Sequence, residues 1–324
     1  MTLALLGAGA WGTALAIALA ARHDVRLWSR DAEQASRMAA SRRNERYLPD
    51  AVIPPNVAIQ PSLEACLAGA QLAIIATPTA GLRSVLRHIG DTPLLWACKG
   101  FERSTGKLPH QVVEDELPGR RTAGAFSGPS FAAEVARGQP TALTVAAGDA
   151  AFARDTARAL HQPRLRVYYS DDVVGVQIGG AVKNVMAIAT GICDGLGFGL
   201  NARAALITRG LAEVTRLGIR MGGRAETFMG LAGAGDLILT CTGDLSRNRR
   251  VGLELAGGKP LAEVLASIGH VAEGAESAHE VLAVARRLGV DMPVTEAVCG
   301  VLSGGVAPRA AADALLSRDP REEG

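Results

Sequence analysis

The 324-residue sequence is poor in lysine, poor in aromatic residues and almost without net charge. Lysine stands at only four positions (99, 107, 183 and 259), so arginine supplies the other thirty of the 34 basic residues. A formal charge of +2 is too small for the broad basic surface that binds a nucleic-acid backbone. Aromatic residues make up only 4% of the chain and do not accompany its basic run at 246–250. We therefore expect no nucleic-acid partner.

The spacings typical of disulfide frameworks and metal sites are also missing. The five cysteines are scattered, odd in number and without a CxxC pair, which gives no hint of a disulfide framework. The six histidines form neither an HxxxH pair nor a cluster with cysteine, so no bound metal is indicated. Dispersed thiols of this kind suit a reducing compartment, and we expect a cytoplasmic protein.

Long apolar runs are absent as well. We expect no integral membrane segment and no cleavable signal, because the chain opens directly on a strand-like segment. Apolar residues make up 48% and charged residues 20% of the chain, a composition typical of a soluble globular protein. At about 150 residues per domain, the length predicts about two domains.

The first half of the chain alternates short apolar runs with stretches of helical length. The expected helices include 13–22, 31–42 and 80–89, and the apolar runs lie at 2–6, 25–28, 72–76, 94–98, 122–126, 141–147 and 164–169. Continuous apolar strands separated by helices predict a parallel sheet covered on both faces. Residues 1–175 are therefore predicted to form an α/β, Rossmann-like dinucleotide-binding domain.

The second half shows helical patterns only. Helices are expected at 174–193, 203–218, 248–256, 260–267, 274–288, 293–302 and 308–316, and no convincing strand follows residue 170. Residues 176–324 are therefore predicted to form an all-α domain.

The segment GAGAWG at 7–12 follows the first apolar run and opens an alanine-rich helix. Gly7, Gly9 and Gly12 have the spacing of a dinucleotide fingerprint, in which the glycines allow a tight turn, close approach of the pyrophosphate and close helix packing. The amides at the helix N-terminus would then face the phosphates. The alternative is a purely structural tight turn.

The residues after the second strand bear on the choice between NAD and NADP. Arg30 lies eighteen residues beyond Gly12, where arginine can pair with a 2′-phosphate, and Asp31 follows directly. Arg30 favours the phosphorylated cofactor, whereas Asp31 could hold a ribose hydroxyl. The alternative is that Arg30 is an ordinary solvated charge.

Lys183 stands in GGAVKN at 179–184, inside an otherwise apolar helix with small neighbours. Desolvation would let its amine act as a base near neutral pH. The alternative is a lysine that extends to solvent above closely packed helices.

Two further segments carry polar groups suited to a binding site. Asp236 in GAGDLILTC is a carboxylate among apolar residues, which needs a partner such as a lysine or else caps the following segment, LILTC. Ser246, Arg247 and Asn248 begin a helix, where free amides and a guanidinium can bind an anion. The alternative is a capped helix with a solvated basic first turn.

Two loops follow strands of the predicted sheet. Lys99 comes directly after LLWAC, and Gly128 and Ser130 come after TAGAF. Ligands bind at the carboxyl ends of parallel strands, so we expect these loops to face the cofactor and the substrate.

Taken together, GAGAWG, ACKG (97–100), SGPSFA (127–132), GGAVKN, GAGDLILTCT (233–242) and SRNRR (246–250) resemble the bacterial NAD(P)-dependent glycerol-3-phosphate dehydrogenases in the same order. The likeness covers essentially the whole chain and implies a dinucleotide-binding domain followed by a helical substrate domain. One departure is Ala10, where many relatives carry serine, which removes a hydroxyl near the pyrophosphate.

The resemblance implies roles for individual residues. Lys183 would be the general base, with Asp236 beside it. Substrate contacts would come from Lys99, Gly128, Ser130, Lys183, Asn184, Asp236, Thr240, Ser246, Arg247 and Asn248. Cofactor contacts would come from Gly7, Gly9, Ala10, Trp11, Gly12, Arg30, Lys99, Ala132, Arg247, Val271 and Glu273.

The implied reaction is the interconversion of sn-glycerol 3-phosphate and dihydroxyacetone phosphate with NAD or NADP, which supplies glycerol phosphate for phospholipid synthesis. The partner would be a small phosphorylated three-carbon substrate, and the sequence leaves open whether the protein is a homodimer. Two alternatives are a two-domain dehydrogenase acting on a 3-hydroxy acid and a non-catalytic nucleotide-sensing module. The SRN segment argues against the first, and Lys183 with Asp236 argues against the second.

Overall fold

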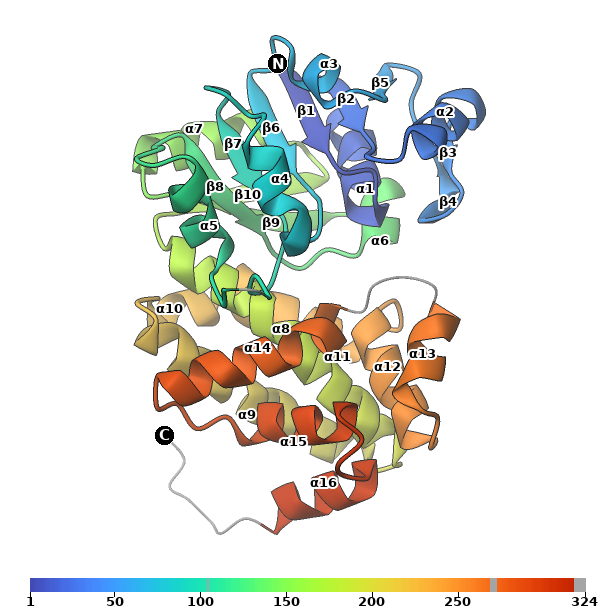
Figure 1. Ribbon diagram of the computed structural model, residues 1–324, viewed down its shortest axis with the longest axis vertical. Helices are drawn as coiled ribbons and strands as arrows, with labels where there is room; N and C mark the ends of the chain where they lie inside the picture. The colour runs from blue at the N-terminus through green and yellow to red at the C-terminus, as the bar shows by residue number, and fades with distance from the viewer. Residues whose placement is uncertain (104, 269–272, 318–324) are drawn as a thin grey trace. The chain divides into compact units, whose positions relative to one another are not determined.

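The computed structural model describes residues 1–103, 105–268 and 273–317, and the chain forms two compact units, Met1–Gln177 and Ile178–Gly324 (Figure 1). The first is an α/β unit built on a sheet, and the described residues of the second are helical, so the predicted fold class is confirmed. Both the expected domain boundary at 175/176 and the division between the units fall inside helix α8 (Val173–Gly195).

The N-terminal unit is built on a twisted sheet with the strand order β10-β9-β8-β7-β6-β1-β2-β5 (Figure 1). Residues 3–6 of β1 are fully buried, which explains why the apolar runs in the sequence are continuous rather than alternating. The strands are β1 (Thr2–Leu6), β2 (Asp24–Trp28), β5 (Val57–Gln60), β6 (Leu72–Ile75), β7 (Leu94–Trp96), β8 (Ala123–Ser127), β9 (Thr141–Ala146) and β10 (Leu165–Ser170).

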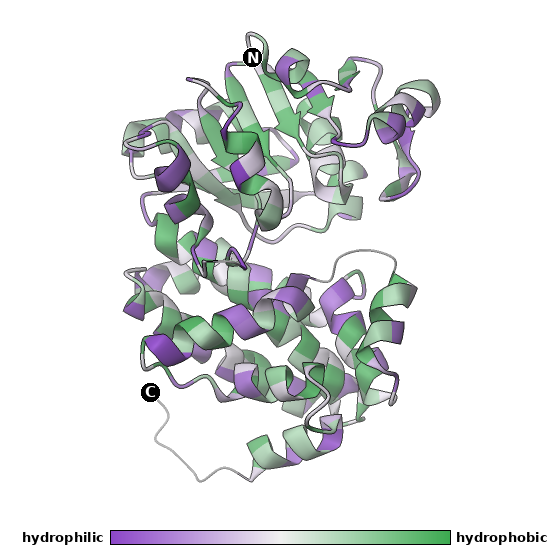
Figure 2. Cartoon of the chain, viewed as in Figure 1, coloured by the Kyte–Doolittle hydropathy of each residue, from purple (hydrophilic) through white to green (hydrophobic). Residues whose placement is uncertain are grey.

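Helices pack their apolar sides against this sheet, whose central strands are strongly apolar (Figure 2). Leu15 and Leu19 of α1 and Leu160 of α7 belong to one buried cluster with Leu5 of β1 and Val145 of β9. The helices are α1 (Ala10–Leu19), α2 (Ala32–Ser41), α3 (Leu63–Leu67), α4 (Leu82–Leu86), α5 (Pro109–Glu116), α6 (Ala132–Ala136) and α7 (Ala150–Leu160).

The expectation of an entirely parallel sheet is wrong at one place, because β8 and β9 pair antiparallel. The sequence also gave no sign of β5 or of the small antiparallel pair β3 (Arg43–Asn44) and β4 (Leu48–Val52). The apolar run of β5 is only three residues long, β3 has none, and β4 contains a proline and an aspartate and buries only Leu48 and Ala51. Such strands form because of their neighbours rather than their own pattern.

The helical unit is arranged around α8, and no strand follows β10 in the described part of the chain. Two short helices, α10 (Ala225–Phe228) and α11 (Asp236–Thr242), and a π-helical turn at Leu231–Gly235 were not expected. After α8 come α9 (Gly199–Arg220), α10 (Ala225–Phe228), α11 (Asp236–Thr242), α12 (Arg247–Ala256), α13 (Leu261–Ile268), α14 (Glu273–Arg287), α15 (Pro293–Leu302) and α16 (Pro308–Leu316).

Among the helices described, α8 is long and apolar enough to cross a membrane by length and composition alone. However, 83% of its apolar window is buried inside the structure. This degree of burial is typical of the core helix of a folded domain.

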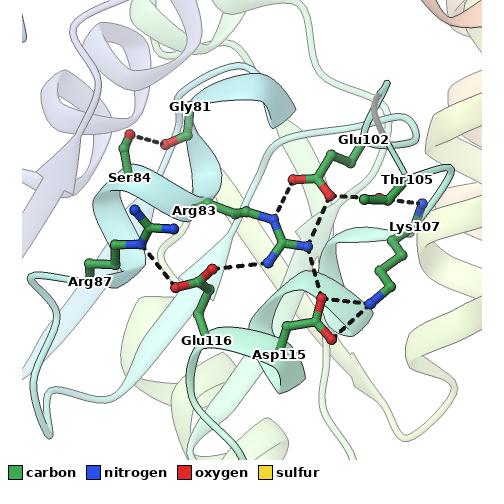
Figure 3. Close-up of polar contacts among 9 residues, drawn as sticks. All are labelled: Gly81, Arg83, Ser84, Arg87, Glu102, Thr105, Lys107, Asp115 and Glu116. Atoms are coloured by element: carbon green, nitrogen blue, oxygen red, sulfur yellow. Dashed lines mark hydrogen bonds and ion pairs between the residues drawn. The ribbon is translucent and has the colours of Figure 1, made fainter.

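Within the N-terminal unit, Arg83 of α4 joins three carboxylates (Figure 3). Its guanidinium binds Glu102 through Nε at 2.7 Å and Nη2 at 3.0 Å, and it also reaches Asp115 and Glu116 of α5 at 2.8 and 2.9 Å. Glu102 is 7% exposed and lies in the segment after β7, which also contains Lys99. Arg83 therefore ties this segment to α4 and α5.

We expect Arg83→Gln to lower the free energy of unfolding by about 2 kcal/mol, because it leaves the carboxylates around it without their shared charged donor. Arg83 holds the pKa of Glu102 below its ordinary value through charged hydrogen bonds. The difference from the wild type should therefore be full near pH 7 and shrink as the pH falls through the carboxylate range. Urea denaturation at several pH values measures both effects.

The matched control is Arg87→Gln, because Arg87 is 66% exposed and binds Glu116. Because solvent screens the Arg87 guanidinium, its loss should destabilise the protein much less than the loss of Arg83 does. Equal destabilisation by the two substitutions would contradict the central position given to Arg83.

Candidate functional site

The glycine-rich turn after β1 has three glycines with different constraints. Gly7 has φ +122°, and a Cβ there would lie 2.9 Å from the carbonyl of Ala76, which follows β6. A Cβ on Gly12 would lie 1.9 Å from the carbonyl oxygen of Gly7. At Gly9 nothing stands within 4 Å of the same point. The fold thus requires Gly7 and Gly12, while Gly9 leaves open space at the start of α1.

This turn lies where the strand order changes direction, with β2 on one side of β1 and β6 on the other. Such switch points are where open α/β sheets bind ligands. Gly9 is the N-cap of α1 and provides no side-chain acceptor for the first amides of the helix. Those amides and the positive end of the helix dipole suit a pyrophosphate. The residues present therefore fit a dinucleotide.

Two buried polar side chains, Asn44 and Gln34, hold the glycine-rich turn through hydrogen bonds. The sequence did not point to either of them. Asn44 Nδ2 and Gln34 Nε2 each donate a hydrogen bond of 2.9 Å to the carbonyl of Ala8. Asn44 Nδ2 also lies 2.7 Å from Thr13 Oγ1. Asn44 is 1% exposed although it comes from the unexpected strand β3. The one possible signal in the sequence was Gln34, a polar residue on the side of α2 that also carries Ala35 and Met38.

Trp11 and Ala132, both expected at the cofactor, lie at the starts of α1 and α6. They pack against the same small apolar cluster, which includes Ala14 and Val135. Ala10, the position where many relatives carry serine, is half-buried at the first position of α1.

Arg30 and Asp31 have different surroundings. Asp31 is the N-cap of α2, and its Oδ1 accepts a hydrogen bond of 3.0 Å from the amide of Gln34. Arg30 is exposed. Asp31, which could hold a ribose hydroxyl of NAD, thus already uses one carboxylate oxygen to cap α2.

The two strand-end loops expected at the substrate both lie in the N-terminal unit. Lys99 follows β7, and its carbonyl accepts a hydrogen bond of 2.8 Å from Thr79 Oγ1. Gly128 follows β8 with φ +144°, and a Cβ there would lie 2.9 Å from the carbonyl of Ala142. Ser130 Oγ donates to the Gly128 carbonyl at 3.0 Å.

In the helical unit, Lys183 of α8 and Asp236 of α11 form a buried ion pair. Lys183 Nζ lies 2.5 Å from Asp236 Oδ1, and the two side chains are 11% and 1% exposed. The alternative interpretation, in which the Lys183 amine extends to solvent, is therefore wrong. The alternative of a helix cap is also wrong for Asp236, because the N-cap of α11 is Gly235 and the carboxylate contacts the lysine.

A π-helical turn, Leu231–Gly235, brings Asp236 to this position. Two glycines allow it: a Cβ on Gly233 would lie 2.1 Å from the Phe228 carbonyl oxygen, and one on Gly179 of α8 would lie 2.1 Å from the Ala232 carbonyl oxygen. The turn therefore packs directly against the backbone of α8. Single π-turns of this kind occur often at functional sites.

The neighbouring residues of α11 are also buried. Thr240 Oγ1 donates to the carbonyl of Asp236 at 2.6 Å. Burial raises the pKa of the adjacent Cys241 thiol to about 12, so it stays protonated at neutral pH.

The beginning of α14 lies between two asparagines that were expected at the substrate. Asn184 Nδ2 donates to Glu273 Oε2 at 3.0 Å, and the amide of Gly274 donates to Asn248 Oδ1 at 3.0 Å. A Cβ on Gly274 would lie 2.6 Å from the carbonyl oxygen of Asn184. Glu273 thus contacts Asn184, while Val271 lies outside the described residues.

The start of α12 has the features of an anion site. Ser246 is the N-cap, and its Oγ accepts a hydrogen bond of 3.2 Å from the Arg249 amide. Arg247 is exposed, and the first turn contains no acidic residue. Arg249 pairs with Asp194 and Asp244 through its guanidinium. Arg247 is therefore the better candidate for binding an anion, because the guanidinium of Arg249 is already paired with two carboxylates.

The helical unit thus links one group of expected residues through direct contacts. Lys183 contacts Asp236, and Asn184 and Asn248 both hold the start of α14. Lys99, Gly128 and Ser130 belong to the N-terminal unit, with the residues of the glycine-rich turn.

Comparisons with known proteins cover both units. The family model for the NAD-dependent glycerol-3-phosphate dehydrogenase N-terminus matches residues 2–153, and the model for the C-terminus of the same family matches residues 172–313. The glycerol-3-phosphate dehydrogenase [NAD(P)+] of Dechloromonas aromatica is 57% identical over 327 residues, covering 100% of this chain and 99% of that protein. The protein of the same name from Aromatoleum aromaticum is 58% identical over 328 residues and is fully covered.

A solved structure is similar over the same length. The crystal structure of glycerol-3-phosphate dehydrogenase from Coxiella burnetii matches with a TM-score of 0.93 and 42% identity. The match covers 98% of this chain and 99% of that one.

The contrast between Gly9 and Gly12 gives a test of the turn as a cofactor site. Gly9→Asp should abolish NADPH binding because it places bulk and charge where a pyrophosphate would lie, and the melting temperature should change little since the space is open. Gly12→Ala should instead lower the melting temperature, because its methyl group collides with the Gly7 carbonyl. Quenching of NADPH fluorescence and thermal denaturation measure the two effects. Full NADPH binding by Gly9→Asp would contradict this interpretation.

Proposed function

Because the chain belongs to the family of NAD-dependent glycerol-3-phosphate dehydrogenases, we propose that Lys183 and Asp236 carry out its proton transfer and that Arg247 binds the phosphate of its substrate. The chain is an oxidoreductase that interconverts sn-glycerol 3-phosphate and dihydroxyacetone phosphate with NAD(P)(H). This reaction supplies glycerol phosphate for phospholipid synthesis. The observation that carries the residue assignment is the buried ion pair in an otherwise apolar helix.

The pair is suited to donate and accept one proton. Burial of a charged lysine is unfavourable without a partner, and the Asp236 carboxylate stabilises the ammonium form of Lys183. The bound nicotinamide would supply the hydride in the reductive direction. As C2 of the ketone becomes an alcohol carbon, Lys183 Nζ would donate a proton to the developing alkoxide. In the oxidative direction, the neutral amine would take the hydroxyl proton.

The start of α12 supports phosphate binding by Arg247. Arg247 stands at the first position of the helix, directly after the Ser246 cap, and its side chain is exposed. A guanidinium offers a planar fork of donors to a phosphate, and the helix end adds amides and a favourable dipole. Lys99, Gly128, Ser130, Asn184, Thr240 and Asn248 are proposed as further substrate contacts.

The glycine-rich turn supports cofactor binding by the N-terminal unit. The open space at Gly9 and the uncapped amides of α1 suit the pyrophosphate. Arg30, exposed beside the helix-capping Asp31, is proposed to pair with the 2′-phosphate of NADPH and to favour it over NADH. Trp11, Ala132 and Glu273 are proposed as further contacts.

A cytoplasmic location and a homodimer are also proposals. The five cysteine side chains are buried as thiols, which suits a reducing compartment.

Lys183→Ala should lower the turnover number by roughly 10²–10⁴, which is the usual contribution of a general acid or base. NADPH binding should stay nearly intact because Lys183 is not among the proposed cofactor contacts. Steady-state kinetics and fluorescence titration measure the two quantities. Activity above about a tenth of the wild type would transfer the role to another group, with Lys99 the next candidate.

Arg247→Leu should weaken the use of dihydroxyacetone phosphate by at least about tenfold, since a charge-assisted contact contributes about 1.5–3 kcal/mol. Unphosphorylated dihydroxyacetone has no dianion to bind, so its kcat/KM should change much less. Both ketones are compared at saturating NADPH, because Arg247 is also a proposed cofactor contact. Equal losses for the two ketones would contradict phosphate binding by Arg247.

A further inference from the structure

Asp194, near the end of α8, is the centre of an ion-pair cluster that the proposed chemistry does not use. Its Oδ2 accepts from Arg249 Nε at 2.9 Å and Nη2 at 2.8 Å, and from Arg203 Nη1 at 3.1 Å. The Asp194 and Arg249 side chains are only 12% and 13% exposed. The pair therefore joins α8 to the first turn of α12 in a nearly dry environment.

The backbones of these two helices also touch. A Cβ on Gly191 of α8 would lie 2.0 Å from the Arg249 carbonyl oxygen. A Cβ on Gly252 of α12 would lie 2.1 Å from the Ile188 carbonyl oxygen. The absence of side chains on both glycines brings the helices into direct contact beside the ion pair. This second contact fixes the separation of the helices, and the ion pair can fix how far one slides along the other.

α8 connects this anchor to the proposed proton donor. Lys183 and Asp194 are eleven residues apart on one continuous helix, which is about three turns and about 16 Å. They therefore lie on the same side of α8. Arg249 lies two residues after Arg247, whose side chain is proposed to bind the phosphate.

We propose that Asp194 is a positioning residue that, through Arg249, holds the start of α12 at a fixed distance along α8 from Lys183. The distance matters because the substrate places its phosphate and its reacting C2 oxygen a fixed number of bonds apart. Arg247 and Lys183 must match that spacing when the substrate is bound. This inference rests on the proposed roles of Lys183 and Arg247.

The chain offers a matched control for the charge of Asp194. Asp244 binds Nη1 of the same Arg249 at 3.0 Å, but it is 97% exposed and does not belong to α8. Both acids neutralise the same guanidinium, and only Asp194 connects it to the helix that carries Lys183.

The experiment compares Asp194→Asn with Asp244→Asn at saturating NADPH. Asp194→Asn should raise the KM for dihydroxyacetone phosphate about tenfold, because the phosphate site moves relative to Lys183. Its kcat/KM for unphosphorylated dihydroxyacetone should change by less than about twofold, since that ketone does not use the phosphate site. Asp244→Asn should leave both values within about twofold of the wild type.

Two further variants separate positioning from a merely structural role. Asp194→Glu keeps the charge, so its KM for dihydroxyacetone phosphate should return close to the wild-type value. This variant also tests the proposal if Asp194→Asn fails to fold. Arg249→Gln should behave as Asp194→Asn does, and the double variant should be little worse than either single one, because both substitutions break the same contact. Equal losses for both ketones, equal effects of the two aspartates, or multiplied losses in the double variant would overturn the proposal.

The outcome is distinguishable from failure of the proposed function. If Arg247→Leu affects the two ketones equally, the proposed phosphate site is wrong, and the positioning role is overturned with it. If Arg247→Leu discriminates between the ketones but Asp194→Asn does not raise the KM, only the positioning role is wrong.

Discussion

The burial of one lysine against one aspartate is the constraint on which the helical unit depends. Lys183 stands in an apolar helix, so its charge is tolerable only with a carboxylate at hydrogen-bond distance. Asp236 supplies that carboxylate and follows directly on the π-helical turn Leu231–Gly235. The turn fits because Gly179 and Gly233 allow backbones to touch. The same backbone contacts that pack the π-helical turn against α8 therefore also bring Asp236 to Lys183.

Glycines also allow close backbone contacts elsewhere around α8. Gly191 faces the carbonyl of Arg249, Gly252 faces that of Ile188, and Gly274 faces that of Asn184. The first two contacts bring α12 against α8 at backbone distance, and the third does the same for α14. Close-packed interiors transmit displacement rather than absorb it, so the polar groups on these helices hold fixed separations. In the N-terminal unit, the buried Asn44 and Gln34 hold the glycine-rich turn in a comparable way.

Much of the fold followed from the pattern of residues. Continuous apolar runs predicted the central strands because β1 and β6 are covered on both faces, and the change to helical spacing predicted the second unit. The elements that were missed, such as β4 and α11, are short and carry no periodic signal. The antiparallel pairing of β8 with β9 also has no signature in the strand sequences, since direction depends on how the chain returns.

The sequence by itself determined which chemical groups are available: a glycine-rich turn, a rare lysine in an apolar helix, an acid among apolar residues and a serine-arginine-asparagine helix start. Only the tertiary structure decided which of them meet. Lys183 and Asp236 are 53 residues apart and come together because α8 and the π-helical turn pack through glycine. Likewise, Arg249 is occupied by Asp194 whereas Arg247 is exposed, a difference that two neighbouring arginines in one run cannot reveal. The sequence specifies which side chains are present. Which of them form pairs depends on their distances in space, and these are set by the long-range packing of the helices.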